Sequence, residues 1–307
     1  MRKDFVNLLA KKAAADPRVI LLVGDLGFGV MEDFKKRLPK QFFNAGVAEG
    51  NMVGIAAGLA LSGFTPVCYT IGTFMSLRPL EQIRDDVCVS NLSVKFVGIG
   101  AGYGYSIYGP THHSNDDIAM FRPLPNMVIF SPADPQELKA VFRAAFGYRG
   151  PVYIRLPRRS VEPIYSRPPR FSLGKAIMVK PGKDHYIFAT GTMVTNALEA
   201  ARHLDSLGSR VGVISFPTIK PIDKGLITRV AAKAKTILTL EPHSIIGGLG
   251  TAVAEILSEQ KAKVKFKRLG YPDQFVHVAG SEQYLEKKFR LDTPGVVKTW
   301  KRFITTN

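Results

Sequence analysis

Short apolar runs alternate with helical patterns along the first half of the chain. Residues 19–23 are apolar throughout, a pattern typical of a strand buried on both faces of a parallel sheet. Further short runs rich in β-branched or aromatic residues predict strands at 41–45, 65–69, 94–98, 128–131 and 152–156. Apolar positions at helical spacing predict the helices between them, at 4–15, 31–38, 50–61, 83–91 and 135–148. This alternation predicts an α/β unit with a mostly parallel sheet flanked by helices.

A break in this pattern separates the first unit from a second one. Residues 159–172 contain three prolines and no periodicity, so we expect a linker over residues 159–174. Beyond it, the pattern predicts strands at 175–179, 185–190, 210–215 and 236–240, and helices at 194–207, 223–233, 248–259 and 294–303. The turn Pro181-Gly182-Lys183-Asp184 predicts a hairpin between the first two of these strands. Because 307 residues exceed one ordinary core, we expect two domains, 1–158 and 175–307.

The overall composition is that of an ordinary globular protein and excludes several classes. Hydrophobic residues make up 46% of the chain, but no apolar run reaches the ~18 residues that a membrane span needs. The first residues carry no apolar signal core, and Cys68 and Cys88 give neither a disulfide framework nor metal-ligand spacing. We therefore expect a cytoplasmic protein with reduced thiols and no membrane partner.

The charge is less ordinary. The formal net charge is +17, of which +12 falls after residue 166. A Lys-rich segment predicts a strand with one solvated and one buried face, because alternate residues are lysines: Lys261, Lys263, Lys265 and Lys267. Such a surface suits nucleic-acid binding, but the segment lacks exposed aromatics and any recognised binding motif. We expect no nucleic-acid partner and favour attraction of anionic substrates or of an acidic partner subunit.

Two glycine-rich turns have some features of dinucleotide-binding loops. Residues 24–29 (Gly-Asp-Leu-Gly-Phe-Gly) follow a strand but lack the GxGxxG order. Residues 247–250 (Gly-Gly-Leu-Gly) open a helix, but Glu241-Pro242-His243 stands between them and their strand. Tight turns explain both segments better than nucleotide sites.

One carboxylate, Glu49, stands where an apolar strand gives way to a run of tiny residues at 54–60. Each Gly weakens a helix by up to ~1 kcal/mol relative to Ala, which is tolerable where another backbone or a cofactor comes very close. A carboxyl group at the start of such a helix is largely desolvated, which suits a group that shares a proton with a heterocyclic nitrogen. The alternative is an N-terminal Glu that the helix dipole favours.

A long Gly-rich loop, residues 98–117, follows a predicted strand and carries His112 and His113. Loops at the carboxyl ends of parallel strands are where α/β folds place their sites. We favour proton transfer or substrate binding by His112. A metal site formed by the two histidines with Asp116 and Asp117 is the alternative.

Seven short motifs occur in one order along the chain: Arg2-Lys3, Gly24-Asp25-Leu26, Phe43-Asn44-x-Gly46-Val47-x-Glu49, Thr73-Phe74, Gly109-Pro110-Thr111-His112, Leu156-Pro157-Arg158 and Glu241-Pro242 with Gly247-Gly248. With them the chain resembles, over essentially its full length, the C-terminal half of transketolase and of 1-deoxyxylulose-5-phosphate synthase. The resemblance implies a thiamine-diphosphate-binding fold: a pyrimidine-binding domain at 1–158, the linker at 159–174, and a transketolase C-terminal domain at 175–307.

The resemblance also implies roles around the cofactor, thiamine diphosphate. Glu49 would protonate the aminopyrimidine ring of the cofactor, and Phe74 would stack on that ring. Asp25 and Leu26 would line the cofactor pocket. His112 would shuttle protons or bind the oxygens of the substrate.

Substrate contacts follow the family only in part. Arg158 and Arg2 look like the phosphate-binding arginines of the family, whose fork geometry suits phosphate. The family's Asp four residues before the matching His is Tyr108 here, its upstream loop His falls at Gly100, and the Ser after its Asp-Leu pair is Gly29. Those groups hold sugar hydroxyls and phosphate in the sugar-phosphate enzyme, so these differences leave the identity of both sugars open.

The other half of the family's cofactor site carries a Gly-Asp-Gly motif and a later Asn, which nothing in this sequence matches. The resemblance therefore implies a split transketolase in which an N-terminal partner subunit holds the diphosphate with Mg²⁺ or Ca²⁺, in an α2β2 assembly. The expected reaction is transfer of a two-carbon ketol unit from a ketose (phosphate) to an aldose (phosphate). The alternatives are a subunit like 1-deoxyxylulose-5-phosphate synthase or a 2-oxo acid dehydrogenase beta subunit, and a non-catalytic scaffold. Retention of Glu49, Phe74 and His112 argues against the scaffold.

Overall fold

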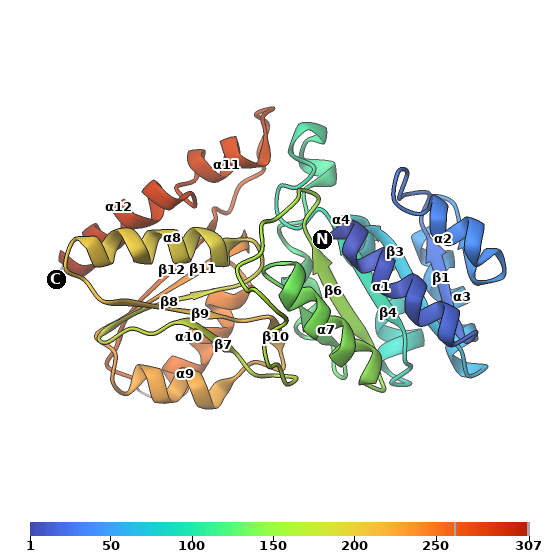
Figure 1. The fold of residues 1–307 in the computed structure, drawn as a ribbon, viewed down its shortest axis with the longest axis horizontal. Helices are drawn as coiled ribbons and strands as arrows, with labels where there is room; N and C mark the ends of the chain where they lie inside the picture. The colour runs from blue at the N-terminus through green and yellow to red at the C-terminus, as the bar shows by residue number, and fades with distance from the viewer. Residues whose placement is uncertain (261, 306–307) are drawn as a thin grey trace.

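The structure is a computed structural model that describes residues 1–260 and 262–305, and its strands form two sheets side by side (Figure 1). In the described part of the chain, the first sheet has seven strands in the spatial order β10 (Thr218–Lys220), β5 (Val128–Phe130), β6 (Val152–Leu156), β4 (Lys95–Ile99), β3 (Thr65–Ile71), β1 (Val19–Val23) and β2 (Phe42–Asn44). Within the same described ranges, the second sheet has five: β12 (Lys265–Tyr271), β11 (Thr236–Ser244), β8 (His185–Ala189), β9 (Val211–Ser215) and β7 (Ile177–Lys180).

Helices cover both faces of each sheet. One face of the first sheet packs against α1 (Arg2–Ala15), α2 (Glu32–Arg37) and α7 (Pro135–Gly147). Its other face packs against α3 (Glu49–Leu61), α4 (Gly72–Leu77), α5 (Leu80–Gln82), a π-helical turn η2 (Ile83–Cys88) and α6 (Asp117–Phe121). Short 3₁₀ turns lie at η1 (Pro39–Gln41), η3 (Ser106–Tyr108) and η4 (Pro110–His112). The second sheet lies between α8 (Met193–Ser206), α11 (Glu282–Lys288) and α12 (Thr293–Thr305) on one side and α9 (Lys224–Ala231) and α10 (Leu249–Glu259) on the other (Figure 1).

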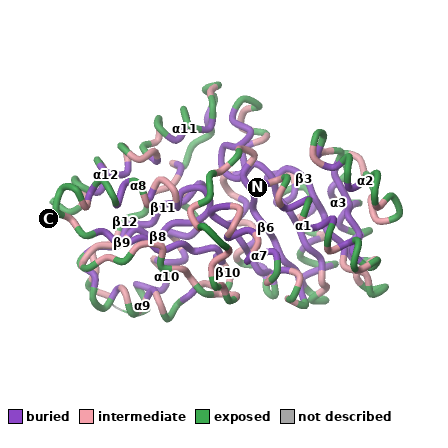
Figure 2. Tube along the Cα trace, viewed as in Figure 1, coloured by how far each residue is buried: buried purple, intermediate pink, exposed green. Residues whose placement is uncertain are grey.

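The uninterrupted apolar runs have a simple physical origin. Successive side chains of a strand point to opposite faces, so a strand covered on both sides needs apolar residues at every position. In β1, Ile20 and Leu22 join one core cluster while Leu21 and Val23 join the other. Buried residues accordingly follow the strands in Figure 2. The predicted architecture of two mostly parallel sheets flanked by helices is confirmed.

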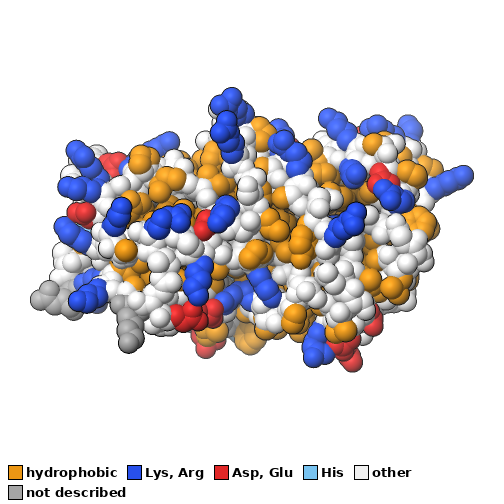
Figure 3. Space-filling view, turned by 90° about the horizontal axis from the view of Figure 1, so that it is seen from below, with side chains coloured by type: hydrophobic (Ala, Val, Ile, Leu, Met, Phe, Trp, Pro, Cys, Tyr) orange, Lys and Arg blue, Asp and Glu red, His pale blue; other side chains and the backbone are white. Residues whose placement is uncertain are grey.

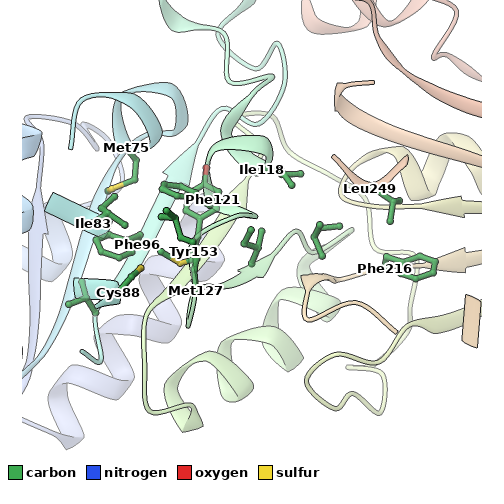
Figure 4. Close-up of a cluster of buried hydrophobic side chains, with 14 of the residues drawn as sticks. Met75, Ile83, Cys88, Phe96, Ile118, Phe121, Met127, Tyr153, Phe216 and Leu249 are labelled. Carbon is green, nitrogen blue, oxygen red and sulfur yellow. The ribbon is translucent and has the colours of Figure 1, made fainter. Parts of the chain in front are cut away.

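The two sheets share one continuous apolar cluster. Met75 and Phe96 of the first unit belong to the same cluster as Phe216 and Leu249 of the second (Figure 4). In addition β10, which comes from the second half of the sequence, pairs antiparallel with β5 at the edge of the first sheet. Sequence patterns did not predict β10. The two units are therefore packed together through a shared core and a shared sheet.

The predicted hairpin is wrong. Strand β7 pairs antiparallel with β9, and β9 lies between β7 and β8. The turn at 181–184 does not close a two-stranded ladder, because the backbone N–H of Lys183 donates to the carbonyl of Arg210, just before β9. Strands β7 and β8 are therefore consecutive in the sequence but not neighbours in the sheet, because β9 lies between them.

The predicted Lys-rich strand is shifted along the chain. Strand β12 starts at Lys265, where it pairs with Thr236 of β11, and it runs to Tyr271. Lys263 precedes the strand, and Lys261 lies outside the described residues. On the face in Figure 3, Lys and Arg side chains are scattered over both halves of the molecule with apolar side chains between them.

The predicted linker, residues 159–174, contains neither a helix nor a strand. It is nevertheless fixed, because the backbone N–H groups of Ile164 and Tyr165 donate to the carboxylate of Asp134 at 2.6 and 3.1 Å. Asp134 also caps the start of α7. Of the helices in the described ranges, none is long and apolar enough to cross a bilayer.

Candidate active site

Glu49 is the first residue of α3, and its carboxylate is buried, with a residue exposure of 2%. Its Oε1 accepts a hydrogen bond from Thr70 Oγ1 at 3.1 Å, and its Oε2 accepts one from Arg78 Nη1 at 2.8 Å. Thr70 lies near the carboxyl end of β3, and Arg78 follows α4. The predicted burial of a carboxylate at the start of a Gly- and Ala-rich helix is confirmed.

The end of β1 touches this carboxylate. A Cβ atom at Gly24 would lie 2.9 Å from Thr70 Oγ1 and 3.4 Å from Glu49 Oε1, so this position requires glycine. The next residue, Asp25, has a positive φ of 49°. Asn44 of β2 holds it there by two hydrogen bonds: Asn44 Nδ2 donates to Asp25 Oδ1 at 2.9 Å, and the Asp25 backbone N–H donates to Asn44 Oδ1 at 3.2 Å. Asp25 and Leu26 line a hollow of about 260 Å³ beside Asn44.

A row of side chains in contact with one another leads away from Glu49. The Arg78 guanidinium lies 3.7 Å from the centroid of the Phe74 ring. The centroid of the His112 ring lies 5.1 Å from that of Phe74, and Tyr108 stacks on His112 at 5.2 Å and 29°. Partial burial and the positive charge of Arg78 lower the pKa of His112 below its ordinary value. The imidazole is therefore neutral at pH 7 and can accept a proton.

Two predicted arginines converge on the same row through Tyr105. The Arg158 guanidinium lies 4.8 Å from the centroid of the Tyr105 ring and 5.6 Å from that of Tyr108. Burial raises the pKa of Tyr105, and the nearby charges of Arg2 and Arg158 partly offset that rise. Arg2 from α1 and Arg158 after β6 thus bring positive charge to the end of the row that carries Tyr108.

The structure therefore brings the predicted site residues into one neighbourhood: Glu49, Phe74, His112, Tyr108, Arg158 and Arg2, with Asp25 and Leu26 beside them. Sequence reasoning missed Thr70, Arg78 and Tyr105. Thr70 could have been found, since it stands near the carboxyl end of an apolar strand, where α/β folds place their sites. Arg78 carries no sequence signal, because its contact with Glu49 is set by packing across 29 residues of chain.

The alternative metal site is not formed. Asp117 instead accepts hydrogen bonds from Arg155 Nε at 2.8 Å and from the Tyr153 hydroxyl at 2.6 Å, and the Arg155–Asp117 pair is fully buried. Burial alone would raise the pKa of Asp117, but the Arg155 guanidinium holds it below its ordinary value. His113 is buried against Tyr103, away from the row. In the described ranges, no group of three His, Cys, Asp or Glu side chains could hold a metal ion.

The glycine-rich turn at 247–250 is filled by a side chain of this protein. Glu241 accepts hydrogen bonds from the backbone N–H groups of Leu249 at 2.6 Å and Gly250 at 2.8 Å. A Cβ at Gly248 would lie 2.0 Å from Glu241 Oε2. Burial raises the pKa of Glu241 to about 7 although these hydrogen bonds favour its charged form. The start of α10 thus has a built-in carboxylate where a nucleotide-binding loop would hold phosphate.

Comparison with known proteins identifies both halves of the chain. Residues 1–163 match the pyrimidine binding domain of transketolase, and residues 174–296 match the transketolase C-terminal domain. A 6-deoxy-6-sulfo-D-fructose transketolase subunit from Clostridium sp. (strain MSTE9) is 38% identical over 299 residues, which are 97% of this chain and 92% of that protein. A 1-deoxy-D-xylulose-5-phosphate synthase from Chlorobium phaeovibrioides (strain DSM 265 / 1930) is 39% identical over 305 residues, which are 98% of this chain and 48% of that protein.

A solved structure agrees with these relatives. It is described as a split gene transketolase, inactive beta4 tetramer, and it matches with a TM-score of 0.88 and 36% identity over 99% of this chain and 97% of that chain. The resemblance predicted from seven short motifs is thereby confirmed. The chain belongs to the transketolase family.

Proposed function

We propose that the chain is the C-terminal subunit of a split transketolase that uses thiamine diphosphate. It would transfer a two-carbon ketol unit from a ketose (phosphate) to an aldose (phosphate). The relative from Clostridium, a transketolase subunit that this chain matches over 92% of its length, supports the proposal. Within it, residues 1–158 form the pyrimidine-binding domain, 159–174 the linker and 175–307 the C-terminal domain.

The contacts of Arg78 support the fit of the cofactor. The guanidinium is flat and positively charged, lies on the Phe74 ring and donates to Glu49. A protonated aminopyrimidine ring is also flat and donates to a carboxylate, so it can take the same place. The Arg78 side chain is 42% exposed, which lets it move aside. When bound, thiamine diphosphate supplies the electron sink that permits a carbon–carbon bond of the ketose to break.

Glu49, the row of side chains beside it and the neighbouring pocket residues each have a role in this proposal. Glu49 holds the proton of the pyrimidine ring, and burial keeps water from competing for it. Phe74 stacks on the ring, while Asp25 and Leu26 line the pocket beside it. Neutral His112 accepts or returns a proton at the hydroxyl groups of the substrate.

Substrate binding is assigned to the far end of the row. Arg158 and Arg2 bind a phosphate or another anionic group of the sugar, because guanidinium groups pair with such groups in a fork geometry. Tyr108 is exposed, stacks on His112 and lies near Arg158, so it contacts the sugar chain. A tyrosine offers sugar hydroxyls one neutral oxygen in place of the two charged oxygens of an aspartate, which makes it a determinant of sugar choice.

A partner subunit is part of the proposal. No Gly-Asp-Gly motif with a following Asn occurs in the sequence, so the group that holds the diphosphate with Mg²⁺ or Ca²⁺ comes from a second chain. Apolar side chains lie exposed on and around α3 and α4: Val47, Ile55, Leu61 and Leu77. Such exposure near Glu49 favours burial against further chains, in keeping with an α2β2 assembly.

The observation that carries the proposal is the buried carboxylate of Glu49 beside the edge-to-face pair of Phe74 and His112. The direct experiment combines the chain with a candidate N-terminal subunit, thiamine diphosphate and Mg²⁺, and follows two-carbon transfer from a ketose to an aldose. Ketol transfer by the mixture, and none by either chain alone, is the expected result. A mixture that binds the cofactor and transfers nothing would refute the reaction.

The similarity to 1-deoxy-D-xylulose-5-phosphate synthase supports a second candidate reaction. An enzyme of that type joins the acyl part of a decarboxylated 2-oxo acid to an aldose. Release of CO₂ from a 2-oxo acid by the reconstituted pair, without transfer from ketoses, would favour this alternative. Dependence on a lipoyl-bearing partner would instead favour a 2-oxo acid dehydrogenase beta subunit, and a non-catalytic scaffold would do neither.

The pH behaviour of His112 follows from its neighbours. Arg78→Met removes a positive charge but keeps an apolar cover on Phe74, so the pKa of His112 rises toward its ordinary value of 6.5. NMR titration of the His112 ring in the full chain measures this shift. Arg84→Met, which removes another exposed arginine, leaves the His112 titration unchanged. A pKa of His112 that stays fixed or falls in Arg78→Met would contradict the geometry of the row.

A further inference from the structure

The second unit contains a basic pocket that the proposed reaction does not use. It is a hollow of about 640 Å³ between β12 and α12. Five cationic side chains line it: Lys265, Lys267, Arg290, Lys298 and Arg302. The rest of the lining is Thr299 and three half-buried apolar residues, Leu269, Phe289 and Phe303. Of the described residues that line the basic pocket, none is acidic.

The secondary structure forces these positive charges together. Residues two apart on a strand point to the same face, which brings Lys265 and Lys267 to the side of β12 that faces α12. Residues four apart on a helix are also neighbours, so Lys298 and Arg302 share the opposite wall. Lys265 Nζ lies 5.4 Å from the centroid of the Phe303 ring, which joins the two walls.

Arg290 is a further cation of the basic pocket, and its backbone has an unusual conformation. It follows α11 with a positive φ of 60°, a region that favours glycine. Its backbone N–H donates to the carbonyl of Lys287 at the end of that helix, so glycine would serve the turn better. The position instead presents a guanidinium to the basic pocket. A strained residue of this kind favours a binding role over a structural one.

We propose that the basic pocket binds a small polyphosphate anion that carries a flat ring, the chemistry of a nucleoside triphosphate. Lysine and arginine side chains on two walls provide charge-assisted hydrogen bonds to phosphate oxygens. Phe289, Phe303 and Leu269 offer an apolar surface for the ring. A volume of 640 Å³ lies within the range of small-molecule pockets, about 300–1,000 Å³.

The basic pocket is separate from the candidate active site. Figure 1 places α12 at one end of the molecule and α3, which carries Glu49, at the other. None of the pocket-lining residues belongs to the row from Glu49 to Tyr108. The inference therefore stands whether or not the chain catalyses ketol transfer, and it gives the Lys-rich segment a purpose.

Isothermal titration of ATP into the full chain, without added metal, tests the proposal. We expect binding of one ATP per chain, weakened at least tenfold by Lys267→Glu and by Lys298→Glu, each of which reverses one charge in the basic pocket. Lys233→Glu is the matched control, since it changes the net charge equally from the turn that follows α9, and α9 lies on the opposite side of the second sheet from α12 (Figure 1). The two test variants lie on different walls, so one remains informative if the other does not fold.

Several results would overturn the inference. Equal weakening by Lys233→Glu would mean that ATP responds only to the net charge of the protein. Tripolyphosphate binding as tightly as ATP would exclude a role for the ring. A single-stranded RNA oligonucleotide that binds more tightly than ATP, and that Lys267→Glu weakens, would make the surface a nucleic-acid site instead. Absence of ATP binding to the wild-type chain would refute the proposal outright.

Discussion

Glu49→Gln lowers the rate of ketol transfer in the reconstituted two-subunit enzyme by at least ~100-fold, within the range that a positioned acid or base contributes. Glutamine keeps the shape of the side chain: its carbonyl oxygen can accept from Arg78, and its amide group can donate to the hydroxyl of Thr70. It cannot share a proton with a ring nitrogen as a carboxyl group does. The fold therefore survives while cofactor activation is lost. Steady-state turnover at saturating thiamine diphosphate measures the effect.

A matched control separates this role from a general effect of charge. Glu162→Gln neutralises an exposed carboxylate in the linker and should leave turnover unchanged. Circular dichroism and thermal unfolding of the Glu49→Gln chain should match the wild type. Turnover within a factor of two of the wild type in Glu49→Gln would remove the role assigned to this carboxylate.

Arg155→Met destabilises the chain by about 3–5 kcal/mol, the cost of removing one partner from a buried ion pair. Arg155 is fully buried and donates to Asp117, and its Nη2 also donates to the carbonyls of Ser114 at 2.7 Å and Pro242 at 2.8 Å. These contacts join the loop of the candidate site to the second unit. Methionine leaves the Asp117 carboxyl group buried without its guanidinium partner, so it must either stay charged there or take up a proton, and both cost free energy. Urea unfolding measures the loss of free energy.

The double variant Arg155→Met/Asp117→Asn tests the cause. It removes the stranded charge, so it should be more stable than Arg155→Met alone, although the lost hydrogen bonds keep it below the wild type. Arg149→Met, at an exposed arginine, should change the unfolding free energy by less than ~0.5 kcal/mol. A cost below ~1 kcal/mol for Arg155→Met, or a double variant no more stable than the single one, would contradict this explanation.

The pattern of apolar residues along the sequence predicted those strands whose burial alone determines their residues. The five apolar residues of β1 were expected as a strand with the bounds that the structure gives, because burial on both faces leaves no polar position. The partner of β7 could not be predicted, because the turn at 181–184 signals a reversal of the chain but not the strand to which the chain returns. Strand β10 was missed for a related reason. Its three residues form a strand only by pairing with β5, almost ninety positions earlier in the sequence.

Some residues of the candidate site could likewise be predicted from the sequence, and others could not. Glu49 and His112 were accessible from sequence, since each stands at a marked change of pattern and in a motif of the family. Arg78 was not, because its contact with Glu49 exists only once the fold brings the end of α4 to the first residue of α3. The metal alternative at Asp116 and Asp117 failed because the sequence does not reveal that Arg155 reaches the same place.

In the proposed enzyme, this chain completes the cofactor site only together with a partner subunit. Calorimetric titration of thiamine diphosphate with Mg²⁺ into the chain, into the candidate N-terminal subunit and into their equimolar mixture tests this claim most directly. We expect micromolar binding by the mixture and at least ~100-fold weaker binding by the chain alone, a difference of about 2.7 kcal/mol. Micromolar binding by the chain without any partner would contradict the divided site.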